Sequence, residues 1–402
     1  MTNLKKRHAA EKRFQMAGKI AIGISFAFLA FLMFTILEKG ISGLQQTQIK
    51  LEVEFKRIDI ESKNYKKLIR DSLDTKFPDI SSNSERRALY RLVADPAKFI
   101  LQDMVESDTS LVGETEEVWL PADEKIDIFY KQNTDDWATK ASPLQIRLLN
   151  ELKQQNLIDL NFNKNFFLIG DSQEPELAGI AGALIGSILT ILVCMFSAIP
   201  LAVLAAIYLE EFAPKNKITD LIEVNINNLA AVPSIVFGLL GLAVYLNFFG
   251  MPRSAPFVGG FTLALMVIPV IIIATRAALK AVPPSIRQAA MGIGASPLQV
   301  VLHHTLPLAM PGIMTGTILS IARALGETAP LLMIGMVAFI ADVPKGFSDP
   351  ATVMPVQIYL WSKNNQIGFV EKTAAAIIIL LVILILLNII AVWIRKKYER
   401  RW

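Results

Sequence analysis

The chain is poor in the residues that build redox and metal chemistry. It has one cysteine, Cys194, and three histidines among 402 residues. A single thiol excludes an intrachain disulfide and leaves the redox compartment open. No histidines, cysteines or carboxylates have metal-ligand spacing, so we predict no metal site and no catalytic residues. A Gly-x-x-x-x-Gly-Lys-Ser/Thr loop is also missing, which excludes ATP binding of that kind by this chain.

Charged residues are scarce as well. Only 19% of the residues are charged, the net charge is +4, and lysine and arginine gather at the chain ends and in one internal loop. This distribution gives no basic face for a nucleic acid. Hydrophobic residues make up 53% of the chain, above the roughly 45–50% of soluble proteins. The composition therefore indicates a membrane protein.

Long uncharged runs support this conclusion. The run at 20–37 follows a basic N-terminus and could be a signal peptide or a spanning helix. We favour the helix, because the run is longer than a signal core and no cleavage site follows it. Four further uncharged runs, at 177–209, 224–252, 254–275 and 373–394, are long enough to cross a hydrocarbon core of about 30 Å, and so is the apolar stretch at 312–341, which only Arg323 and Glu327 interrupt. We expect an all-α polytopic protein of about six transmembrane helices.

The basic residues predict the orientation and the domains. If every run is a span, the N-terminal cluster, the loop at 276–304 and the C-terminal tail lie on one side, which the positive-inside rule makes cytoplasmic. We therefore expect four parts. They are a cytoplasmic N-terminus with the first helix (1–37), an extracytoplasmic domain (38–176), a transmembrane domain (177–394) and a basic cytoplasmic tail (395–402).

The segment 38–176 has the mixed composition of a soluble domain. Apolar residues alternate from Ile49 to Phe55, which predicts a strand, whereas 85–104 and 143–156 have helical patterns. We expect a mixed α/β insert with a structural or partner-contact role.

The loop at 280–311 contains no acidic residue and is too polar to be another span. Ser285 is placed to cap one helix, Gly294 to end it, and Ser296 with Pro297 to start a second helix. Small residues between these points would form a knob with little side-chain bulk. The segment could dock a cytoplasmic partner or lie as an amphipathic linker on the bilayer surface.

Residue spacing favours docking. Gln288-Ala289-Ala290 is followed after three residues by Gly294, and after nine more by His304, Thr305, Leu306 and Pro307. This pattern resembles the coupling-loop motif of ABC importer permeases, with Gln288 in place of a glutamate and His304 in place of an isoleucine. The resemblance assigns coupling to an ATPase to the following residues: Gln288, Ala289, Ala290, Gly294, Leu306 and Pro307.

Within that superfamily, the chain resembles the PstA-type permeases of phosphate importers over about 177–394. Three segments carry the likeness: Tyr208-Leu209-Glu210-Glu211, the run from Val232 to Gly238, and the run from Ile321 to Pro330. The resemblance implies a type I ABC importer permease fold in the bacterial inner membrane and a non-enzymatic subunit. It also implies a homologous C-type permease, a cytoplasmic ATPase dimer that binds ATP and magnesium, and an extracytoplasmic phosphate-binding protein. The insert resembles that of a subgroup with an added N-terminal domain.

Two charged residues interrupt the apolar stretch at 312–341. Arg323 and Glu327 are one helical turn apart, share a face and can pair. Each would cost roughly 2.5–3.5 kcal/mol at the centre of a lipid-facing helix, so both should face protein or a water-filled path. The pair is either a static contact or a switchable one whose arginine meets an anion in transit, and we favour the second. Arg276 is either a membrane-surface anchor, which we favour, or a further substrate contact.

Three alternatives remain at this stage. The permease could carry another oxyanion, because a guanidinium serves several of them. An ion-gradient-driven secondary transporter would require inverted repeats with broken helices, and no such pair is evident in the sequence. A receptor would leave the downstream spans and the intramembrane charges without a role.

Overall fold

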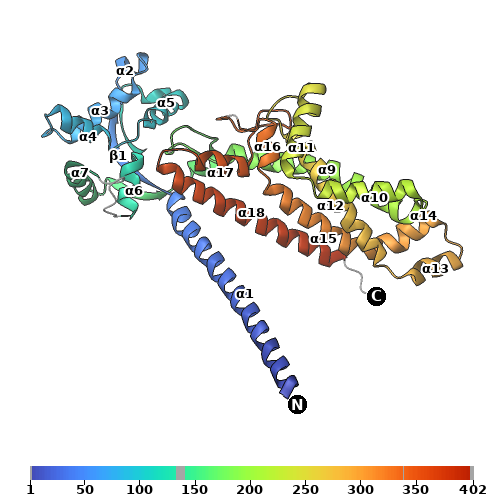
Figure 1. Ribbon diagram of the computed structural model, residues 1–402. Coiled ribbons are helices and arrows are strands. Elements are labelled where there is room, and N and C mark those ends of the chain that lie inside the picture. Colours follow the sequence, from blue (N-terminus) through green and yellow to red (C-terminus); the bar gives the residue numbers. More distant parts are fainter. Residues whose placement is uncertain (1, 133–140, 338, 399–402) are drawn as a thin grey trace. The chain divides into compact units, whose positions relative to one another are not determined.

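The computed structural model describes residues 2–132, 141–337 and 339–398 (Figure 1). The chain forms two compact units. The first comprises residues 1–162 with 366–378, and the second comprises 163–365 with 379–402. Helix α18 (Gly368–Tyr398) supplies its first turns to one unit and the remainder to the other.

The first unit contains a small antiparallel sheet with strand order β2-β1-β3. Ile49 on the central strand lies opposite Leu120 on β2 and Ile158 on β3. The elements are α1 (Thr2–Gly43), β1 (Gln45–Glu54), α2 (Arg57–Glu61), α3 (Tyr65–Lys76), α4 (Asn83–Tyr90), α5 (Ala97–Ser107), η1 (Thr109–Leu111), β2 (Thr115–Pro121), α6 (Glu124–Gln132), α7 (Pro143–Gln154) and β3 (Ile158–Phe162). This arrangement confirms the predicted mixed α/β character of the insert.

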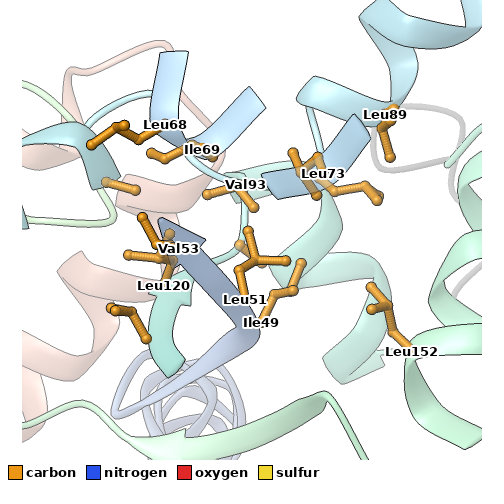
Figure 2. Packing of buried hydrophobic residues seen from close by; sticks show 14 of the residues in the cluster. Ile49, Leu51, Val53, Leu68, Ile69, Leu73, Leu89, Val93, Leu120 and Leu152 are labelled. Carbon is orange, nitrogen blue, oxygen red and sulfur yellow. The ribbon is translucent and has the colours of Figure 1, made fainter. Parts of the chain in front are cut away.

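The core of this unit is built on one face of β1. Ile49, Leu51 and Val53 are buried in alternation with charged neighbours, and Figure 2 shows them among side chains of α3 and β2. Because strand side chains alternate between faces, this pattern directs one row into the core. Each buried aliphatic side chain contributes about 1.5–3 kcal/mol. The strand predicted from Ile49 onward is confirmed.

The helix predicted over 85–104 is wrong in one respect. The structure has α4 and α5 there, separated by residues 91–96. Pro96 is the N-cap residue of α5. A proline lacks the backbone N–H of a helix interior and disfavours helical geometry in the residue before it, so the chain restarts the helix at this point.

A buried ion network joins four elements of the first unit. Lys131 on α6 lies 2.6 Å from Asp127 and 3.2 Å from Glu371 of α18, and only 5% of its side chain is exposed. The Ser42 hydroxyl of α1 donates to Glu371, and the Thr47 backbone N–H of β1 donates to Asp127. The carboxylates and the ammonium therefore satisfy one another away from water.

The second unit is helical. Helix α12 packs against both α9 and α15. Gly260 of α12 approaches Val193 of α9, Gly316 of α15 approaches Ala274 of α12, and Cys194 is buried. Small residues allow such close approach in membrane helices. The elements are α8 (Asn165–Leu168), α9 (Ala181–Ile207), η2 (Tyr208–Phe212), α10 (Lys217–Ala230), α11 (Ser234–Gly241), η3 (Leu242–Phe248), α12 (Pro256–Lys280), α13 (Pro284–Gly292), α14 (Pro297–Val300), η4 (Val301–Thr305), α15 (Leu306–Leu325), α16 (Ala329–Met333) and α17 (Met354–Ser362).

Several helices have the length and composition of membrane spans. Within the described residues there are 5 such helices, Lys6–Gly43, Ala181–Phe212, Pro256–Lys280, Pro297–Leu325 and Gly368–Lys397. A sixth candidate is the pair Lys217–Ala230 and Ser234–Phe248, which is bent by 101°. The run expected to form one span over 224–252 is therefore divided into two helices at a sharp bend. Pro233 at the break explains the bend, because it cannot continue a helix.

The apolar run at 312–341 also differs from a simple span. Its helix begins earlier, at Pro297, and ends at Leu325. Gly326 follows as the C-cap residue, and Pro330 opens the short α16. The π-helical segment η4 directly precedes Pro307 at the start of α15. Proline has no backbone N–H to donate, and the wider π-helical turn rearranges the backbone hydrogen bonds there. At the other end of the chain, the expected tail over 395–402 falls partly on α18 and partly on 399–402, which lie outside the described residues.

Candidate functional site

The segment proposed to dock a partner is a short helix followed by a sharp turn. Helix α13 begins after Pro283, so the expected cap at Ser285 is wrong: Pro283 occupies the N-cap position. Gly294 has a φ of +93°, the left-handed conformation expected after a helix end. The second helix starts after Ser296 with Pro297, as the sequence predicted, and Ser296 forms a capping box with Gln299 at the start of α14.

The residues assigned to coupling do not all lie on the surface. Gln288, Ala289 and Gly294 are exposed, whereas Ala290 is only 4% exposed and faces the interior. Leu306 and Pro307 are half-buried at the start of α15. Three of the six predicted residues therefore form the accessible tip, and the others hold it.

Apolar side chains near this tip were missed by the sequence analysis. Met291, Ile293 and Leu298 are exposed, and Ile293 shows 84% of its surface. These side chains lie on both sides of Gly294 in the sequence and give the tip an apolar rim. Exposed apolar residues that gather in this way mark interaction surfaces. Because the helix boundaries decide which of them point outward, the signal in the sequence was weak.

Behind the tip, Arg276 lies in a cluster of charges. Its guanidinium donates to Glu210 at 3.2 Å and to Glu223, and Lys280 lies 3.6 Å from Glu210. Arg276 is mostly buried within this cluster. Its observed partners are carboxylates of η2 and α10, so Arg276 ties the end of α12 to two neighbouring elements.

A second arginine, Arg287, lies in α13 itself. It donates to Glu211 through Nε at 3.2 Å and through Nη2 at 2.7 Å. Neither partner was predicted from the sequence as a functional residue. Their separation along the chain hides the pairing, although Glu211 belongs to the run Tyr208-Leu209-Glu210-Glu211 that carries part of the family resemblance.

Arg323 and Glu327 are brought together, as their spacing predicted. Nε of Arg323 lies 3.5 Å from Oε1 of Glu327. The pair does not sit in mid-helix, because α15 ends at Leu325 and Glu327 lies in the break before α16. The Arg323 side chain is 48% exposed within this chain. It can therefore meet a partner subunit, water or an anion while Glu327 stays beside it.

Two family models match the chain. The model described as "Binding-protein-dependent transport system inner membrane component" matches residues 181–402, more than half of the chain. A second, described as "Domain of unknown function (DUF3333)", matches residues 1–140. The first match covers the docking segment and the ion pairs of Arg276, Arg287 and Arg323.

Three relatives are similar over about half of the chain or more. The phosphate transport system permease protein PstA of Pasteurella multocida is 32% identical over 216 residues, 54% of this chain and 76% of that protein. PstA 1 of Mycobacterium tuberculosis (strain H37Rv) is 31% identical, over 58% of this chain and 75% of that protein. PstC of Haemophilus influenzae is 30% identical, over 52% and 73%. The chain therefore belongs to the binding-protein-dependent transport system inner membrane components, and it is a permease subunit of an ABC importer.

Proposed function

We propose that this permease imports inorganic phosphate. The PstA relatives support phosphate as the substrate, since they are named as phosphate transport permeases. The similarity to PstC supports a second, homologous permease as the partner. Two ATPase subunits carry ATP and magnesium, and an extracytoplasmic binding protein delivers phosphate. The termini are cytoplasmic, and the domain at 38–176 lies outside the membrane.

The observation that carries the coupling role is the tip of α13. Gln288, Ala289 and Gly294 present little side-chain bulk, and the apolar rim around Gly294 offers contact area for an ATPase groove. Because Gln288 carries no charge, the contact relies on shape and apolar burial rather than on an ion pair. Burial of apolar surface contributes about 25 cal/mol per Å².

Substitution Gly294→Trp tests this role. The bulky side chain would hold the ATPase away from the tip, and we expect phosphate uptake to fall about tenfold or more, the change that follows from losing about 1.4 kcal/mol of docking. The measurement is uptake of labelled phosphate in cells, with the amount of permease in the membrane determined in parallel.

Gly113→Trp is the matched control. Gly113 is exposed, has a φ of +95° and has open space around it, just as Gly294 does, but it lies in the insert. Both substitutions impose the same backbone strain of about 1–3 kcal/mol. Normal uptake by Gly294→Trp, or equal loss in both variants, would contradict the coupling role.

We also propose that Arg323 and Glu327 belong to the phosphate path. A guanidinium offers paired donors that match a tetrahedral oxyanion. Glu327 competes for the same group, which keeps anion binding weak enough for release. Another oxyanion would be favoured instead if it displaced phosphate from the assembled complex in direct competition.

A further inference from the structure

Glu210 and Glu211 are neighbours in the π-helical segment η2, yet their carboxylates serve different elements. Glu210 accepts from Arg276 at the end of α12, and Glu211 accepts from Arg287 in α13. Successive residues on a helix point in different directions, so one segment can hold two elements at once. Segment η2 directly continues α9. Motion of α9 is thereby tied to both partners.

Arg287 makes four hydrogen bonds that involve three places in the fold. Besides its two bonds to Glu211, it donates to the backbone carbonyls of Val282 at 2.8 Å and Leu279 at 2.9 Å. These carbonyls lie at the end of α12 and in the turn that follows, where a helix leaves acceptors unsatisfied. The guanidinium thus joins α13, the end of α12 and η2.

The Arg287–Glu211 pair is largely buried, and two hydrogen bonds align it. Only 10% of the Glu211 side chain is exposed. A bidentate bond between an arginine and a carboxylate fixes orientation in addition to charge. Two apolar side chains also attach α13. Ala290 is buried, and Ile286 packs against the cluster formed by Ile207, Leu279, Val282, Val301, Ala309 and Ile313. The ion pair adds a directional contact to this apolar attachment and fixes the orientation of α13.

We propose that Arg287 and Glu211 are the positioning residues that transmit movement of α13 to α9 and α12. This inference rests on the proposed function, because it presupposes an ATPase that moves α13. The proposal assigns Glu211, in the Tyr208–Glu211 segment, the role of transmitting movement between helices. In this role the pair does not touch phosphate.

The test uses the full complex purified with its ATPase subunits and reconstituted in lipid vesicles. ATP hydrolysis is measured with and without phosphate-loaded binding protein, and the ratio of the two rates reports coupling. We expect Glu211→Gln and Arg287→Gln each to lower this ratio at least about tenfold, equivalent to about 1.4 kcal/mol. The content of ATPase in the complex should stay unchanged. Arg287→Lys retains a charge without the bidentate geometry and should give an intermediate ratio.

Lys280→Gln is the control, because it removes an exposed charge near Glu210 without touching the Arg287 contacts. Its ratio should match that of the unaltered complex. Ratios near normal in both Glu211→Gln and Arg287→Gln would overturn the inference. Loss of ATPase from these variants would overturn it too, since the pair would then serve assembly. Failure of the unaltered complex to respond to phosphate would instead contradict the proposed function.

Discussion

At the scale of single residues, Arg323 is the side chain whose surroundings bear most directly on substrate passage. It stands at the end of α15, exposed within this chain, with one carboxylate close by. A static ion pair would make both members equally necessary for stability. A switchable pair gives them opposite effects on the anion, because one binds it and the other competes with it.

We therefore expect Arg323→Gln and Glu327→Gln to differ. Loss of the arginine removes a charged hydrogen bond of about 1.5–3 kcal/mol and should reduce uptake about 10- to 100-fold. Loss of the carboxylate should lower the apparent KM for phosphate and also lower the maximal rate, since release slows. Uptake measured over a range of phosphate concentrations separates these effects.

Leu319→Gln provides a reference for this pair, because Leu319 is an exposed residue one turn before Arg323 on the same helix. Its kinetics should stay close to those of the unaltered protein. Equal reductions of the maximal rate in Arg323→Gln and Glu327→Gln, without any change in KM, would favour the static contact.

At the scale of elements, the first unit depends on how α6 meets the start of α18. Lys131 bridges Asp127 and Glu371 there, and Gly368 at the start of α18 donates its backbone N–H to Glu124 of α6. Breaking one partner of a buried ion pair leaves an uncompensated charge, at a cost of about 3–5 kcal/mol. We therefore expect the contacts between α6 and the start of α18 to be lost together when one of these charges is removed.

Lys131→Met tests this expectation. We expect the backbone amides of 368–378 and β1 to exchange hydrogen about a hundredfold faster, since local opening would become easier by about 3 kcal/mol. Lys125→Met, at an exposed position of the same helix, should leave exchange unchanged. Equal protection in both variants, measured by mass spectrometry on the purified full chain, would contradict a structural role for this network.

The elements could be predicted from the sequence where one physical signal dominated. Alternating apolar residues predicted the strand that contains Ile49, and the length of the apolar runs predicted the membrane-spanning helices. The breaks at Pro96 and Pro233 were harder to place, because local proline geometry competes with a continuous apolar pattern. The pairing of Arg287 with Glu211 could not be predicted, since contacts between distant residues depend on how α12 and η2 turn the chain. Ala290 was misplaced for the same reason: one helix face decides its burial.

At the scale of the whole molecule, the proposed orientation in the membrane is argued from the distribution of charge. We expect Thr109→Cys to react with a membrane-impermeant maleimide in sealed spheroplasts, because we propose that the insert lies outside. His8→Cys and Lys397→Cys should react only after lysis, because the positive-inside rule places the basic ends in the cytoplasm in the proposed orientation. All three positions are exposed within the chain. Labelling of position 8 or 397 in sealed spheroplasts would contradict this orientation.

The burial of Cys194 makes such experiments simpler. Cys194 lies on α9 and is buried, which hinders the reaction of its thiol with a polar reagent in the folded protein. The natural chain is thus a nearly silent background for site-directed spin or fluorescent probes, without prior removal of its own thiol. A probe at the tip of α13 could then report each ATPase stroke as a change in distance within a working transporter.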